Sequence, residues 1–88
     1  MIRERDVEAY LKKRVEEKGV KIRKARWIGR RGAPDRRILG HCWVEVKAPD
    51  GRLDGHQIRE IADMRLAGEI VEVVYSFHDV DCLVERYL

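Results

Sequence analysis

The fold is decided by the stretch GAPDRRILGHCWVEVK, which runs from Gly32 to Lys47. Side chains in a β-strand alternate between its two faces with a period of two, and the second half of this stretch alternates in that way. One face would carry Cys42, Val44 and Val46, which are apolar and suit a core. The opposite face would carry Glu45 and Lys47, a carboxylate and an ammonium one repeat apart.

A hairpin turn precedes this strand. Gly40 and His41 separate it from a shorter strand that Asp35 opens, and a short glycine-containing loop is typical of antiparallel pairs. The hairpin would bring Asp35 close to Glu45 despite the nine residues between them. Two carboxylates and the Lys47 ammonium at one point indicate a site for a hard divalent cation and an activated water.

Length and composition indicate one small globular domain, residues 1–88. Apolar residues make up 44% of the chain and charged residues 40%, which is typical of a soluble protein with a highly charged exterior. So short a chain buries a modest core, and a partner copy would add stability. No segment approaches the roughly 20 apolar residues of a membrane span, and the charged first residues lack the apolar part of a signal peptide. We therefore expect a cytoplasmic protein, or one in the equivalent compartment of a host cell, with no membrane partner.

Several kinds of chemistry are excluded by residue types. Cys42 and Cys82 follow no metal-ligand spacing, so we expect two small buried apolar residues. The three histidines form no pair at helical spacing with one another, which argues against a zinc site. The only hydroxyl nucleophile of the Ser or Thr type is Ser76, at an expected helix start, so we discard Ser-His-Asp chemistry.

Positive charge gathers ahead of the central strand. Between Lys21 and Arg37 there are eight Lys or Arg residues against one acid, Asp35. Such a local excess is what a phosphate backbone requires, although a solvated surface would show it too. The residues predicted to contact DNA are Lys24, Arg26, Arg30, Arg31, Arg36 and Arg37. Trp27, among them, is either a core residue, which we favour, or a surface for stacking a nucleotide.

Hydrophobic periodicity predicts the remaining elements. We expect a helix over 3–18, a strand over 20–28 with a bend near 23–24, a helix over 54–67, a strand over 69–75 and a helix over 77–87. A three-stranded meander followed by a helical crossover gives a mixed sheet with helices on its faces. The predicted fold class is therefore α/β (α+β), with an αβββαβ core and a C-terminal helix. The face of the 54–67 helix predicted to be buried carries Ile58, Ile61, Ala62 and Leu66.

Two polar residues have both a structural and a functional interpretation. Gln57 stands at the capping-box position after Asp54, so it either caps the helix or reaches the Glu45 and Lys47 site. Glu8 lies at the border of the apolar stripe of the first helix. It is either a surface residue paired with Lys12 or an acid that approaches the site.

Pro34-Asp35 and Glu45-Val46-Lys47 together resemble the signature of the PD-(D/E)xK nuclease superfamily. More closely, the chain resembles the VRR-NUC (virus-type replication-repair nuclease) branch of stand-alone phage or bacterial type. That branch has a first-helix Glu, a Gly-x-Pro-Asp turn, a Trp-x-Glu-x-Lys strand and a Gln that opens the next helix. The matching positions are Glu8, Gly32 to Asp35, Trp43 to Lys47, and Gln57, in order along the whole chain.

The resemblance implies a metal-dependent endodeoxyribonuclease with the restriction-endonuclease-like core. It implies that Asp35, Glu45 and the Val46 carbonyl ligate Mg²⁺ or Mn²⁺, with no organic cofactor. Lys47 would orient the attacking water and stabilise charge on the phosphate, and Gln57 and Glu8 would complete the catalytic set. The resemblance further implies a homodimer that acts on branched DNA, above all on four-way (Holliday) junctions.

Other functions remain open at this point. A flap or nicking nuclease would use the same site on a different DNA structure. A non-catalytic DNA-binding module of a repair complex would keep the fold without the reaction. A subunit of a toxin or of a larger repair complex would be active only with its partner.

Overall fold

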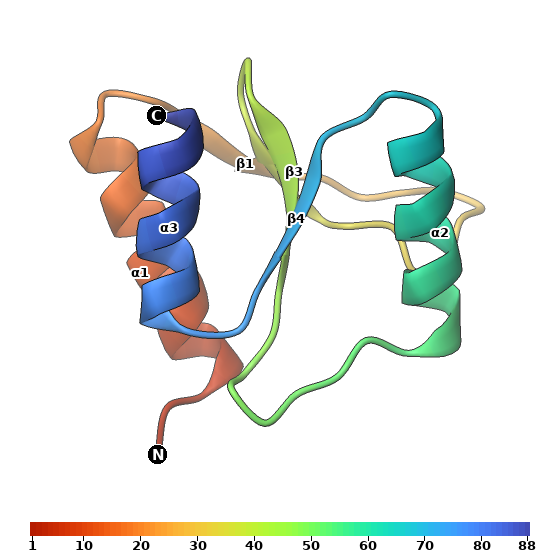
Figure 1. Ribbon diagram of the computed structural model, residues 1–88, viewed down its shortest axis with the longest axis horizontal. Helices are drawn as coiled ribbons and strands as arrows, with labels where there is room; N and C mark the ends of the chain where they lie inside the picture. Colours follow the sequence, from red (N-terminus) through yellow and green to blue (C-terminus); the bar gives the residue numbers. More distant parts are fainter.

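The computed structural model describes all 88 residues and has the element order that the periodicity predicts (Figure 1). The elements are α1 (Glu4–Glu17), β1 (Ile22–Lys24), β2 (Arg36–Ile38), β3 (Cys42–Val46), α2 (Gly55–Leu66), β4 (Val71–Val74) and α3 (Phe77–Tyr87). The predicted α+β class is confirmed. None of the three helices has the length and apolar character required to cross a membrane.

The four strands form one mixed sheet in the order β1-β2-β3-β4. β1, β2 and β3 are antiparallel neighbours, whereas β4 returns through α2 and pairs parallel with β3. α1 and α3 cover one face of the sheet and α2 covers the other (Figure 1). The strand that carries Glu45 therefore lies inside the sheet, with helices on both of its faces.

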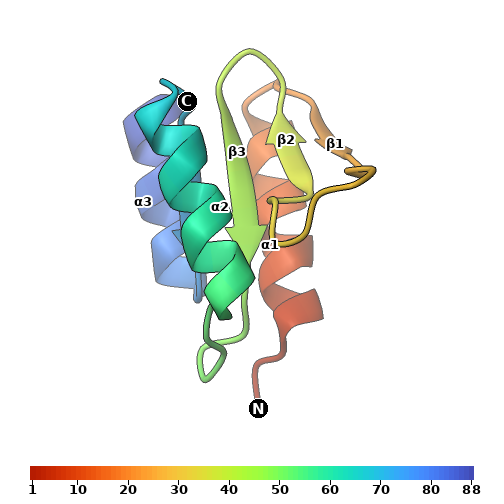
Figure 2. The same ribbon diagram turned by 90° about the vertical axis from the view of Figure 1, so that its right-hand side faces the viewer.

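The β2–β3 hairpin has the predicted turn. Ile38 pairs with Cys42 and Arg36 with Val44, so Leu39 to His41 form the connection (Figure 2). The turn is closed by the His41 amide, which donates to the Ile38 carbonyl over 3.0 Å. Gly40 has a φ of +80°, a left-handed conformation that glycine adopts without a steric penalty.

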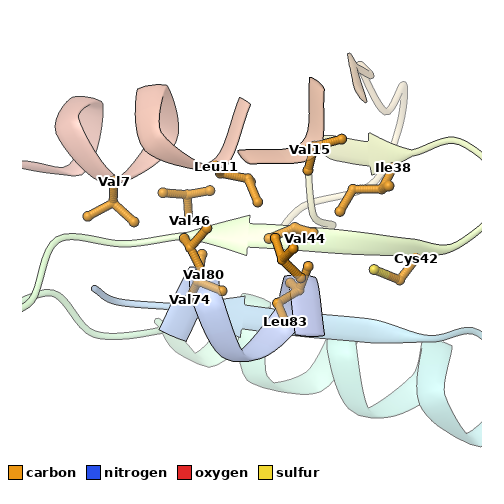
Figure 3. Close-up of a cluster of buried hydrophobic side chains, with 11 residues drawn as sticks. Val7, Leu11, Val15, Ile38, Cys42, Val44, Val46, Val74, Val80 and Leu83 are labelled. Atoms are coloured by element: carbon orange, nitrogen blue, oxygen red, sulfur yellow. The ribbon is translucent and has the colours of Figure 1, made fainter. Parts of the chain in front are cut away.

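The main core lies between the sheet and the α1/α3 pair (Figure 3). It includes the predicted inward face of β3, which is Cys42, Val44 and Val46. A smaller cluster of Ile61, Met64 and Val71 lies under α2, with the half-buried Trp43 packed against it. Because the apolar face of β3 points to α1 and α3, its other face, with Glu45, points to α2.

The predicted buried face of α2 is largely wrong. Ile58 is 56% exposed, Leu66 is 87% exposed and Ala62 is also exposed. The helix instead buries Glu60, Ile61 and Met64. Tertiary contacts set the orientation of α2. Gln57 bonds to Glu45 and Glu60 pairs with Arg30, so the side of the helix that carries these two polar residues faces the protein, and several of the apolar residues face solvent.

Two other burial predictions are wrong. Trp27 is 36% exposed and does not enter the core. The strand that contains this region is also shorter than the expected 20–28, because β1 ends at Lys24, opposite the first residue of its partner β2. Beyond Lys24 only one more backbone hydrogen bond joins the two segments, from the Ala25 amide to the Asp35 carbonyl. Cys82 is exposed because α3 buries Val80, Leu83 and Val84, which leaves Cys82 on the outer side of the helix.

Candidate active site

Glu45 and Lys47 lie together at the end of β3, on the face that α2 covers. Their side chains are 12% and 18% exposed, and Lys47 Nζ lies 3.9 Å from Glu45 Oε2. The alternation of the strand places both on the same side, as predicted. A carboxylate and an ammonium are thus largely withdrawn from water at the mouth of the hairpin.

The pKa of Glu45 is raised from 4.5 to about 7, first by burial of the carboxyl group and second by the nearby Asp35 carboxylate. The Lys47 ammonium acts in the opposite direction, and Glu4 of α1 adds a smaller repulsion. Desolvation and like charges both oppose the ionised form of a carboxylate. A cation at this position would relieve the repulsion between Glu45 and Asp35.

Gln57 makes both of the contacts that its position allowed, one with Asp54 and one with Glu45. Its side-chain Oε1 accepts from the backbone N–H of Asp54 over 3.0 Å, and its backbone N–H donates to Asp54 Oδ1 over 2.9 Å. The two bonds complete a capping box. Its Nε2 donates to Glu45 Oε2 over 2.9 Å. Because Asp54 fixes the oxygen end of the amide, the nitrogen end is directed at Glu45. The cap of α2 and the orientation of Glu45 therefore depend on one side chain.

Gly32 explains why the loop before Asp35 needs glycine. Its φ is +81°, and a Cβ there would lie 2.4 Å from the His56 carbonyl group and 2.6 Å from the Gln57 nitrogen. The loop thus packs backbone against backbone on the first turn of α2. This contact fixes the Asp35 loop against the helix that carries Gln57.

Asp35 and Glu8 both form an ion pair with Arg36. Arg36 Nη1 lies 3.1 Å from Asp35 Oδ1, and its Nη2 forms an ion pair with Glu8. Glu8 therefore pairs with Arg36 and not with Lys12 of its own helix. The Arg36 side chain is only 14% exposed, so this arginine, predicted to contact DNA, lies among carboxylates. The Asp35 side chain remains 51% exposed.

The donors at this site fit a hard divalent cation. Asp35 and Glu45 supply carboxylate oxygens, but no group of three or more His, Cys, Asp or Glu side chains forms a metal site in this chain, so any third protein ligand here would be a backbone oxygen. The register Arg36–Val44, extended by two residues, places Pro34 opposite Val46. Proline has no N–H to donate, so the Val46 carbonyl lacks its usual ladder partner. Three oxygens of this kind are the ligands that Mg²⁺ and Mn²⁺ prefer.

The predicted DNA-contacting residues fall into two groups. Lys24, Arg26 and Arg31 are exposed and form no ion pair. Arg36 and two further arginines are held by the protein: Arg30 pairs with the buried Glu60, and Arg37 lies over the Trp43 ring with its Cζ 5.4 Å from the centroid. The first group leaves its charge free for a phosphate backbone.

Some site features could not be identified from the sequence. Glu4 acts on Glu45 through space although it precedes Glu8 by one turn of α1. The Arg30–Glu60 pair joins residues 30 positions apart in the chain, so no local sequence pattern predicts it. Asp54 did carry a signal, since the capping box that it forms with Gln57 is visible in the sequence.

Comparison with known proteins places these observations in context. No family model and no curated protein matches the chain. A solved structure described as "VRR_NUC domain" matches with 38% sequence identity and a TM-score of 0.84, and the match covers 100% of both chains.

Proposed function

Because this chain belongs to the VRR-NUC family, a group of nucleases of the PD-(D/E)xK type, we propose that it is a metal-dependent endodeoxyribonuclease with its active site at the end of β3. The observation that carries the proposal is the setting of Glu45. Lys47 lies 3.9 Å from it, and Gln57 donates to it over 2.9 Å. The desolvation cost of a largely buried ion pair can exceed the attraction between its two charges, so stability gives little reason for this cluster.

Asp35, Glu45 and the Val46 carbonyl would hold Mg²⁺ or Mn²⁺, which would supply positive charge for the scissile phosphate and lower the pKa of a water. Lys47 would orient the attacking water and stabilise negative charge on the phosphate. Gln57 would hold Glu45 in position. Glu8 would act at the same site through its shared contact with Arg36 and Asp35.

The substrate that we propose is branched DNA, most specifically the four-way junction. The free cations Lys24, Arg26 and Arg31 lie on or near the loop before Asp35, where they would contact phosphates. Phosphate contacts position a protein on DNA without reading sequence, so recognition would depend on DNA shape. A twofold dimer would present two such sites to the two symmetric strands of a junction.

The proposed homodimer needs a surface that the fold leaves open. The apolar residues of α3, Val80, Leu83 and Val84, are buried in the core and cannot provide it. The exposed side of α2 carries Ile58, Ala62 and Leu66 at four-residue spacing. A twofold axis at Ala62 would place Ile58 of one protomer against the partner's Leu66, so this stripe is complementary to itself.

The dimer is tested by light scattering of the purified chain. We expect twice the monomer mass for the wild type and the monomer mass for Leu66→Lys. Ile28→Lys is the matched control, since Ile28 is 96% exposed but lies outside α2. A dimeric Leu66→Lys variant would assign the interface to another surface, and a monomeric wild type would contradict the homodimer.

The function is tested with a labelled immobile four-way junction and a linear duplex of matched sequence, each with Mg²⁺, Mn²⁺ or EDTA. We expect symmetric paired cuts in the junction that need the cation and that are lost in Lys47→Ala and Asp35→Asn. Lys21→Ala is the control, because Lys21 is exposed and lies outside the site. Cuts confined to flaps or nicks would reassign the substrate, and tight binding without cleavage under every metal would leave a DNA-binding module.

A further inference from the structure

A cavity of about 530 Å³ adjoins the candidate active site. Asp35 lies in its wall, together with Gly32 of the same loop. The residues that give the cavity its chemistry are Lys24, Arg26, Trp27 and Arg30. A ligand in this cavity would therefore lie directly next to one of the two carboxylates proposed to bind the cation.

Trp27 is fixed in orientation although it is outside the core. Its indole N–H donates to the Pro34 carbonyl over 2.7 Å, and its ring packs on that of Trp43 with centroids 5.1 Å apart. The residue is still 36% exposed and lines the cavity. A ring that is held by a hydrogen bond and by a second ring, with its remaining surface open, is a suitable platform for another flat group.

The charges around Trp27 favour an anion. Lys24 and Arg26 are exposed and have no carboxylate partner, so their charge is available. Arg30 is steadied by its ion pair with Glu60, a residue that is only 8% exposed. A cavity with an aromatic wall and several cations matches a nucleotide, which combines a flat base with a phosphate.

We propose that this cavity is a subsite for the nucleotide next to the scissile phosphate, with its base stacked on Trp27 and its phosphate held by Lys24 and Arg26. The inference rests on the proposed function, because Asp35 is common to both sites. It adds a requirement that the metal site alone does not contain: one base beside the cut must leave its stack in the DNA. Branched DNA supplies such a base at low cost, since stacking is already interrupted at the branch point.

The subsite is tested by binding in EDTA, where cleavage plays no part. A four-way junction is labelled with 2-aminopurine at successive positions around the branch. We expect the fluorescence of one position to change on binding of the wild type and of Trp27→Phe, and not on binding of Trp27→Leu. The affinity should fall about tenfold in Trp27→Leu, as for the loss of one stacked base. Ile28→Ala, the neighbouring residue outside the cavity, should bind like the wild type.

An abasic nucleotide at the responsive position provides the second measurement. It should weaken binding of the wild type and leave Trp27→Leu unchanged, because the two changes remove the same contact. If Trp27→Leu does not fold, as judged by circular dichroism, the comparison of abasic with intact DNA on the wild type provides the test, because the abasic nucleotide keeps its phosphate and lacks only the base proposed to stack on Trp27. Equal affinity of the wild type for abasic and intact DNA at every position would overturn the subsite. Cleavage without a responsive position would reject the subsite alone, and a responsive position without cleavage under any metal would reject the nuclease alone.

Discussion

Gln57 Nε2 donates a hydrogen bond to Glu45 Oε2 over 2.9 Å, and this bond links the first turn of α2 to the central strand of the sheet. The other end of the same amide is held by the backbone of Asp54. Removal of the Asp54 side chain would leave that backbone contact in place. Removal of the Gln57 side chain would leave the Asp54 carboxylate bonded to the helix amide. The two substitutions therefore separate capping from the orientation of Glu45.

Asp54→Ala should lower the free energy of unfolding by about 1 kcal/mol through loss of the cap, while cleavage stays near the wild-type rate. Gln57→Ala should reduce cleavage by about 10- to 100-fold, as expected for a residue that orients a metal ligand. Urea unfolding and cleavage rates on the same preparations measure both effects. Equal losses of activity in the two variants would mean that Gln57 acts only as a cap.

Glu45→Gln should make the metal-free protein more stable at pH 8 and leave its stability unchanged near pH 4. The pKa of Glu45 is raised from 4.5 to about 7 in the folded protein, so the unfolded chain ionises first as the pH increases. The wild type therefore loses stability between these two pH values, and the loss is complete above the higher one. The full shift corresponds to about 3 kcal/mol. Thermal or urea unfolding in EDTA at both pH values measures it, and an unchanged difference between the two proteins would contradict the raised pKa.

Lys47→Ala should move the pH dependence of cation binding to higher pH. The Lys47 ammonium lowers the pKa of Glu45, so its removal leaves Glu45 protonated over a wider range. A cation binds the ionised carboxylate, and its affinity should increase as the pH rises through 7 in the wild type. Calorimetric titration with Mn²⁺ between pH 6 and 8.5 follows this change, with Lys21→Ala as the control. Identical pH profiles in the wild type and Lys47→Ala would show that the two groups do not interact.

Gly32→Ala should be far more damaging than Gly29→Ala. Both glycines have a positive φ, +81° and +77°, so both substitutions introduce left-handed strain of about 1–2 kcal/mol. Only at position 32 would the new Cβ meet backbone, at 2.4 Å, whereas nothing lies within 4 Å at position 29. The additional loss in Gly32→Ala should appear in the unfolding free energy and in cleavage, because Asp35 follows in the same loop. Comparable stability and activity of the two variants would mean that the loop moves away from α2 without consequence.

Local patterns in the sequence were sufficient to predict the elements whose structure depends on neighbouring residues. The alternation in β3 gave the correct faces for Val44 and Glu45, and the turn at Gly40 gave the hairpin. The side-chain cap at Ser76 was also visible, and it starts α3 by accepting from the Asp79 amide. These features depend on residues that are close together in the chain, so their spacing carries the information.

Long-range contacts determined what the patterns could not predict. The apolar spacing of Ile58 and Leu66 indicated a buried face, but the polar bonds of Gln57 and Glu60 orient α2 differently. Trp27 was expected in the core because tryptophan is mostly buried. It lies instead on a half-exposed loop, where its ring contacts Trp43 and its N–H is used by Pro34.

Pro34 limits how far the hydrogen-bond ladder between β2 and β3 can be extended. Opposite Val46, any other residue would carry an amide proton, and the β2–β3 ladder could extend by one bond. An engineer who replaced Pro34 to lengthen and stabilise the sheet would direct that proton at the carbonyl proposed as a cation ligand. Redesign of this chain for greater stability should therefore leave the open end of the hairpin alone and act on an exposed position outside the site and outside the proposed dimer surface, such as Ile28.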